Sequence, residues 1–144
     1  MVKVQIHKMK KLIAIFMLLS CTSDIIPLNP TVHIKELDAN VLAMSDTGAF
    51  MTMARCGDID VADDTVSFTF KGSSHIFELH QMKLVHGVNS TETVPVVLMN
   101  IGYNGRYKEV RVMLMPLDGF GVDMLLGRNW FGGKYLVHTI RSKR

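Results

Sequence analysis

A two-residue alternation of apolar and polar side chains is the feature of this sequence that most constrains its fold. In VSFTF, residues 66–70, the apolar Val66, Phe68 and Phe70 alternate with polar residues, which is the period of a strand with one buried face. Similar or continuously apolar strand-like stretches cover residues 75–80, 93–101 and 107–115.

Turn residues separate these stretches. The dipeptide Asn104-Gly105 stands between residues 93–101 and 107–115 and is typical of a two-residue hairpin turn. No segment has a long amphipathic helical period, and the one helix that we expect is a short turn beginning near Arg128. Several short strands with turn signals between them predict an all-β fold that closes into a barrel, with one short helix near the C-terminus.

The first twenty residues have the pattern of a signal peptide. A basic segment precedes the apolar run LIAIFMLLS, which is too short to span a bilayer as a mature helix. Residues 22–32 contain two prolines and little periodicity, which is typical of a linker. The remaining length suits one domain. We therefore expect a lipoprotein signal peptide over residues 1–20, a tether over residues 21–32 and a single domain over residues 33–144.

The apolar run ends in LLSC, residues 18–21, which resembles the lipobox of bacterial lipoproteins. The resemblance implies that Cys21 is acylated and becomes the new N-terminus, so that the chain is lipid-anchored in the bacterial cell envelope and faces the periplasm. Met9 is a second candidate start, because MKKLIAIFMLLSC is a complete short signal by itself. The alternative is an ordinary secretory signal in which Cys21 has no role.

The positive charge of the chain is concentrated in this leader. The formal net charge is +3, but Lys3, Lys8, Lys10 and Lys11 lie within residues 1–20. Without these four, twelve of the sixteen Lys and Arg remain against thirteen Asp and Glu, so the mature chain is close to −1. We therefore expect no nucleic-acid partner.

Two short motifs carry the chemistry. The first is DTGA, residues 46–49, at the end of an apolar run, and the second is DMLLGRNWF, residues 123–131. In this order they resemble the retropepsin-like aspartic proteases, and STETVPVV with MLLGR is similar to a bacterial branch often labelled ATP-dependent zinc proteases. The sequence has neither H-E-x-x-H nor a phosphate-binding glycine loop, so we favour an aspartic protease that needs no metal and no cofactor.

The resemblance assigns roles to individual residues. Asp46 would be catalytic, and because one chain has a single DTG, it would supply half of a site completed by a homodimer through the Asp46 loop. Thr47 would hydrogen-bond across the two-fold axis, Gly48 would allow close backbone approach, and Ala49 would leave room for substrate. The second motif would support this loop through Gly127, Arg128 and Asn129.

A protease of this kind needs a hairpin flap that covers the substrate. The first candidate lies within residues 70–76, at Lys71, Gly72, Ser73 and Ser74, and the competing candidate is HGVNST, residues 86–91. The substrate, a peptide or protein, would bind extended, with its main chain paired to strands of the flap and the active site.

Some residues depart from the family pattern. Ser45 stands where an aliphatic residue is usual, and Phe50 and Met51 stand where retroviral members have acids that pair with the arginine of G-R-N. Arg128 would then need another partner, such as Asp58 or Asp60. These departures support an alternative function, a retropepsin-like barrel that binds a peptide or cell-envelope partner without hydrolysis.

Other candidate sites rank lower. His75, His80 and His86 are five and six residues apart and share no helix face, so we expect no zinc site. The acids of CGDIDVADD, residues 56–64, lack the spacing of a calcium loop, and a solvated turn is the better interpretation. We expect Cys56 to be a small core residue and Trp130 to pack against the barrel.

Overall fold

The computed structural model describes residues 24–86, 90–116, 121–132 and 135–138. Its elements, in chain order, are β1 (Asp24–Pro27), β2 (Thr31–Ile34), the 3-10 turn η1 (Lys35–Leu37), β3 (Ala39–Ser45), β4 (Thr52–Arg55), β5 (Gly57–Ala62), β6 (Thr65–Phe70), β7 (Ser73–Glu78), β8 (Gln81–His86), β9 (Thr91–Tyr103), β10 (Arg106–Met115), β11 (Met124–Leu126), α2 (Arg128–Phe131) and β12 (Tyr135–His138).

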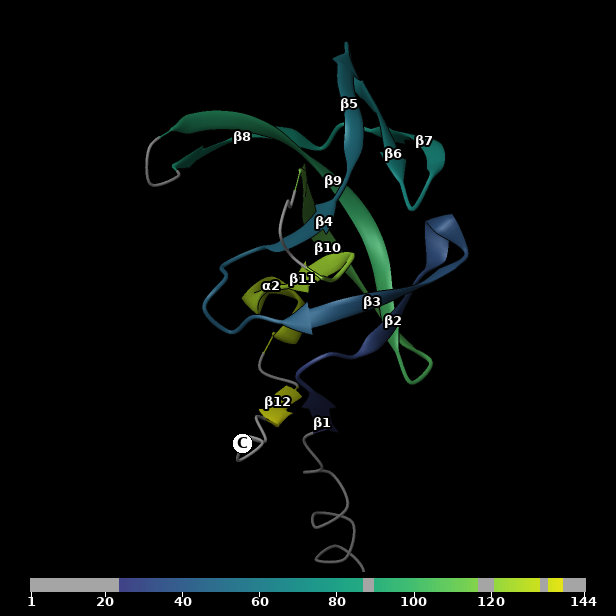
Figure 1. Cartoon of the computed structure of the whole chain (residues 1–144), viewed down its shortest axis with the longest axis vertical. Coiled ribbons are helices and arrows are strands. Elements are labelled where there is room, and N and C mark those ends of the chain that lie inside the picture. Colours follow the sequence, from purple (N-terminus) through teal and green to yellow (C-terminus); the bar gives the residue numbers. More distant parts are fainter. Residues whose placement is uncertain (1–23, 87–89, 117–120, 133–134, 139–144) are drawn as a thin grey trace, which may run out of the picture.

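Six strands form a closed barrel, shown in Figure 1. They follow one another in the order β10, β4, β11, β3, β2 and β9, and the pairing of β10 with β9 closes the ring, while β8 extends the sheet beyond β9. The only α-helix among the described residues is α2, near the C-terminus. The expectation of an all-β barrel with one short helix is therefore confirmed.

The hairpin of β9 and β10 forms for the reason that the sequence indicates. Asn104 and Gly105 both have positive φ, at 50° and 77°, as a two-residue turn of this kind requires. The two strands then pair antiparallel from Arg106 with Tyr103 to Met113 with Val96. This long hairpin supplies two of the six barrel strands.

Apolar side chains from most strands meet in one core. The alternation in β6 buries Val66, Phe68 and Phe70, and the core also contains Cys56. Trp130 of α2 is buried, and its Nε1 donates a hydrogen bond to the carbonyl of Ile101 at 3.2 Å. The expected packing of Cys56 and Trp130 is therefore confirmed.

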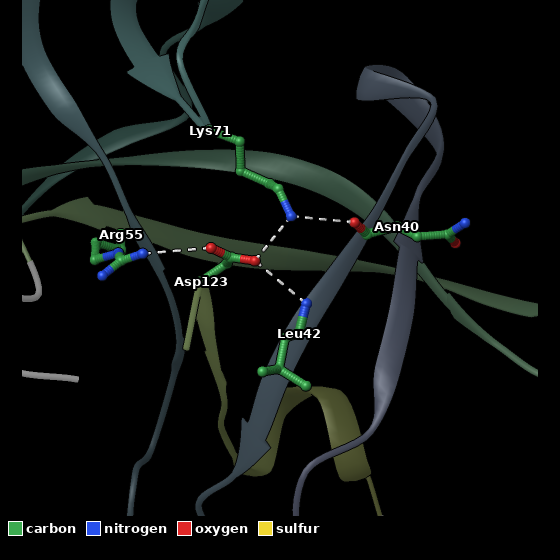
Figure 2. A network of polar contacts seen from close by, with 5 residues as sticks. All are labelled: Asn40, Leu42, Arg55, Lys71 and Asp123. Atoms are coloured by element: carbon green, nitrogen blue, oxygen red, sulfur yellow. Dashed lines mark hydrogen bonds and ion pairs between the residues drawn. The ribbon is translucent and has the colours of Figure 1, made fainter. Parts of the chain in front are cut away.

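A separate three-stranded sheet, β5-β6-β7, shares the apolar core with the barrel and also contacts it through a polar network around one carboxylate. Figure 2 shows Asp123, which precedes β11, at the centre of this contact. Its carboxylate accepts hydrogen bonds from Lys71 Nζ at 3.0 Å and from the backbone N–H of Leu42 at 3.3 Å. Arg55 pairs with its other oxygen at 3.4 Å. The β6–β7 turn is thereby held against β3, β4 and the residue before β11.

The segment expected as a tether is part of the fold from residue 24 onward. β1 pairs parallel with β12, and β2 pairs with both β3 and β9. The link between β1 and β2 is held by Ser45, whose N–H donates to the carbonyl of Leu28 at 2.7 Å and whose Oγ donates to the carbonyl of Pro27 at 3.1 Å. Proline has no backbone N–H to donate, and it is tolerated at the edge of a sheet because no neighbouring strand there needs that hydrogen bond.

Candidate active-site loop

The loop of residues 46–51 crosses the end of a strand that comes eighty residues later in the sequence. β11 lies between β3 and β4, parallel to β3 and antiparallel to β4. β3 ends at Ser45, opposite Leu126, and β4 begins at Thr52. The DTGA and LLGRN motifs are therefore neighbours in space.

The backbone of the loop holds the Asp46 carboxylate in place. Asp46 Oδ1 accepts hydrogen bonds from the N–H groups of Gly48 at 2.9 Å and Ala49 at 3.1 Å, which is an Asx-type turn. The N–H of Asp46 donates to the carbonyl of Leu126 at 3.0 Å. Oδ2 has no hydrogen-bond partner among the described residues, so one oxygen of this half-buried carboxylate is available for other contacts.

Gly48 and Gly127, one from each motif, differ in how much space a Cβ would have. A Cβ on Gly48 would lie 3.2 Å from Asp46 Oδ1, a tight contact with the carboxylate. A Cβ on Gly127 would lie 2.4 Å from the carbonyl carbon of Met51 and 2.8 Å from the nitrogen of Thr52. Because these are backbone atoms, only glycine at position 127 lets the second motif pass beneath the loop.

Thr52 and Asn129 join the two motifs. Thr52 Oγ1 donates to Asn129 Oδ1 at 2.8 Å and accepts from the N–H of Gly127 at 3.1 Å. The N–H of Thr52 also donates to Asn129 Oδ1 at 2.8 Å, and Asn129 Nδ2 donates to the carbonyl of Arg111 at 2.7 Å. Thr52 is a site residue that was not predicted from the sequence, and the only signal for it there is a hydroxyl side chain between Met51 and Met53.

Arg128 supports the loop in a way that differs from the expected ion pair. Its N–H donates to the carbonyl of Ala49 at 2.9 Å, and its guanidinium lies over the ring of Phe50, 5.4 Å from the centroid. Asp58 instead accepts a hydrogen bond from Thr69. The suggested pairing of Arg128 with Asp58 or Asp60 is absent among the described residues, and the guanidinium has the Phe50 ring beside it.

A groove runs between the loop and β8. It has a volume of about 330 Å³, and its lining includes Ala49 and Met51 of the loop, Met113 of β10 and Lys83 to His86 of β8. Phe50 stands at its edge with 63% of its surface exposed, and Lys83 Nζ lies 5.4 Å from the ring centroid. The groove is therefore largely apolar with basic groups beside it.

The first flap candidate lies away from this groove. Lys71 Nζ contacts Asp123 and the carbonyl of Asn40, five residues before the end of β3 at Ser45. At about 3.3 Å per residue, that separation along β3 is roughly 17 Å. The Lys71–Ser74 turn thus sits at the opposite end of β3 from Asp46, as Figure 1 shows for the β6–β7 turn.

The competing flap candidate lies only partly within the described residues. Residues 87–89 lie outside them, and the strands on either side, β8 and β9, pair from Gln81 with Val96 to His86 with Thr91. β8 lines the groove next to the Asp46 loop. The described part of this hairpin is therefore close to the loop, in contrast to the β6–β7 turn.

Outside the Asp46 loop, the ionisable side chains raise two further possibilities, a metal site and a reactive thiol. No group of three His, Cys, Asp or Glu in the described part of the chain is placed to hold a metal ion. Burial raises the pKa of the Cys56 thiol to about 12, so it stays protonated at neutral pH and is a poor nucleophile. No helix within the described ranges is long and apolar enough to cross a bilayer.

Comparisons with known proteins establish the fold and leave the activity open. Neither a scan of protein-family models nor a search of curated proteins finds a match. A Legionella pneumophila protein of unknown function (DUF785) has a similar structure, with 22% identity, a TM-score of 0.66 and coverage of 85% of this chain and 100% of that chain. Simian foamy virus protease is more distant, with 18% identity, a TM-score of 0.43 and coverage of 69% and 87%.

Proposed function

We propose that this chain is one half of a retropepsin-like aspartic endopeptidase, in which the Asp46 carboxylates of a homodimer activate a water molecule to hydrolyse a peptide bond. The observation that carries the proposal is the geometry of the Asp46 loop. A half-buried carboxylate has one oxygen held by two backbone N–H groups. The loop that carries it is braced from beneath by Gly127 and Asn129.

The chemistry requires two such carboxylates close together. Hydrolysis without a metal or a covalent intermediate needs a base for water and an acid for the leaving amine. Two adjacent carboxylates cannot both ionise, so they share a proton and titrate as a pair, one serving as base and the other as acid. Thr47 and Gly48 are exposed, which leaves the loop accessible to a second copy.

The groove supports an extended peptide as substrate. Methionine and valine side chains in its lining suit an apolar side chain, and methionine adapts to several shapes. β8 is the last strand of its sheet among the described residues, so its outer edge has N–H and C=O groups that an added strand could pair with. A peptide lying along β8 would pass the Asp46 loop.

The decisive experiment replaces the proposed catalytic group. Asp46→Asn keeps the size of the side chain and removes its acid and base function, so we expect peptide cleavage to fall by about a hundredfold or more. Asp60→Asn, at an exposed position on β5, is the matched control and should cleave at the parent rate. Equal melting temperatures would show that the fold is intact, and undiminished cleavage by the Asp46→Asn protein would refute the proposal.

A second experiment separates the proposed reaction from a metal-dependent one. The proposed chemistry uses only carboxylates, so a chelator such as EDTA should leave the cleavage rate unchanged. Loss of activity on chelation, with recovery on added zinc, would instead support the zinc-protease label of the similar bacterial branch.

The second candidate function is peptide binding without hydrolysis. The observation that favours it is Phe50, an exposed ring at the position that follows DTGA, with the cationic groups of Lys83 and Arg128 each 5.4 Å from its centroid. A peptide that both the parent and the Asp46→Asn protein retain, and that neither cleaves, would select this function.

We also propose that the mature chain is lipid-anchored through Cys21 in a bacterial cell envelope, facing the periplasm. The support is the LLSC sequence at the end of the apolar run. Mass spectrometry of the N-terminal peptide tests this proposal independently of activity, because acylation adds a defined mass to Cys21.

A further inference from the structure

β1 presents apolar side chains to the outside next to the point where the described chain begins. Ile25 is 62% exposed and Leu28 is 43% exposed, whereas Ile26 between them is buried. β1 and β12 lie together at one end of the molecule, and the β5-β6-β7 sheet lies at the other end (Figure 1). We call Ile25, Pro27 and Leu28, all exposed, the β1 face.

The link from this face to the proposed anchor is short. Asp24 is the first residue of β1, three positions after Cys21. An extended chain spans at most about 3.6 Å per residue, so Asp24 lies within about 11 Å of an acylated Cys21. The hydrogen bonds from Ser45 to Pro27 and Leu28 fix β1 to the barrel. In an anchored chain, the β1 face therefore stays within reach of the bilayer.

The charges around this end are compatible with a lipid surface. Asp24, the acid of β1, is paired with Arg106 at the start of β10. The sequence beyond β12 contains Arg141, Lys143 and Arg144, which would be attracted to anionic headgroups. The combination of exposed aliphatic side chains on β1 with basic residues that follow β12 in the sequence is one that interfacial membrane contacts use.

We infer that the β1 face is a membrane-docking surface that rests on a lipid bilayer and holds the barrel in one orientation, with the β5-β6-β7 sheet directed away from the bilayer. The inference rests on the proposed acylation of Cys21 and is independent of peptidase activity. A bilayer is favoured over a second copy of the chain because the short link brings the lipid to this face in every molecule.

Cysteine labelling on the anchored full-length protein tests the inference. Ile25→Cys and Ile76→Cys form a matched pair, since both isoleucines are exposed strand residues, at 62% and 75%, in β1 and β7. Cys56 is buried with a raised pKa and should not take up the label. Each protein is labelled with an environment-sensitive dye and reconstituted in vesicles of phosphatidylethanolamine and phosphatidylglycerol.

We expect iodide in the aqueous phase to quench the label at position 76 and to quench the label at position 25 several-fold less. Spin-labelled lipid should show the reverse order. Equal iodide quenching of the labels at positions 25 and 76, in protein whose Cys21 is acylated, would overturn the docking inference and leave the anchor proposal intact. A Cys21 without the acyl mass would refute the anchor proposal and the inference with it. The Cys21→Ala protein without vesicles provides a further test. If the label at position 25 is protected from iodide there, and the protection increases with protein concentration, the face is covered by a second copy and the docking inference is overturned.

Discussion

Gly127 shows how one missing side chain supports the candidate site. The backbone atoms of Met51 and Thr52 occupy the space where a Cβ would lie. We expect Gly127→Ala to lower the free energy of unfolding by about 1–3 kcal/mol, because backbone must shift to relieve the overlap. Urea denaturation measures this loss. Gly121→Ala is the control, since a Cβ there meets no atom within 4 Å, and equal effects of the two changes would contradict this account.

Cys56 gives a residue-scale prediction about pH. Burial raises the pKa of its thiol from 9.0 to about 12 in the folded protein. The unfolded chain therefore loses this proton first, and the contribution of Cys56 to stability is full below pH 9 and declines between pH 9 and 12. By pH 10 the loss is on the order of 1 kcal/mol.

The measurement is the free energy of unfolding against pH for the parent and for Cys56→Ala. Replacement by alanine removes the titrating thiol, so the alkaline decline should be shallower than in the parent. Parallel profiles for the two proteins would show that Cys56 does not titrate as its burial implies.

At the scale of elements, Asp123 connects the β5-β6-β7 sheet to the barrel. Its side chain is 18% exposed and contacts Lys71 in the β6–β7 turn and Arg55 at the end of β4. Asp123→Asn removes the charge that both cations face, and we expect a loss of about 1 kcal/mol with faster amide hydrogen exchange in β6 and β7. Asp60→Asn, exposed on β5, should leave that exchange unchanged. Uniform acceleration across the barrel would point to global destabilisation instead.

At the scale of the whole molecule, the proposed site exists only when two chains meet. Activity per chain should therefore rise with protein concentration in parallel with the dimer fraction measured by sedimentation. Adding Asp46→Asn protein to the parent should lower the activity of the parent, because mixed dimers carry only one of the two carboxylates. Constant activity per chain at concentrations where only monomer sediments would contradict the shared site.

The sequence predicted those features that depend on neighbouring residues. The alternation in residues 66–70 specifies which side chains of β6 are buried, and the turn preference of Asn104-Gly105 specifies the β9–β10 hairpin. The resemblance of the two motifs to one protease family implied that the segment around Gly127 supports the Asp46 loop, and the close backbone packing at Gly127 gives the physical reason for glycine there. The alternation and the turn preference are local steric and hydrophobic effects, which a short stretch of chain expresses by itself.

Only the tertiary structure decided which distant segments meet. It incorporates residues 24–32 into the fold, sets the Lys71–Ser74 turn against Asp123 instead of Asp46, and gives Arg128 the ring of Phe50 as its neighbour. It also reveals Thr52 as the link to Asn129. Contacts of this kind depend on the order of strands around the barrel, and strand order results from long-range pairing that no local pattern records.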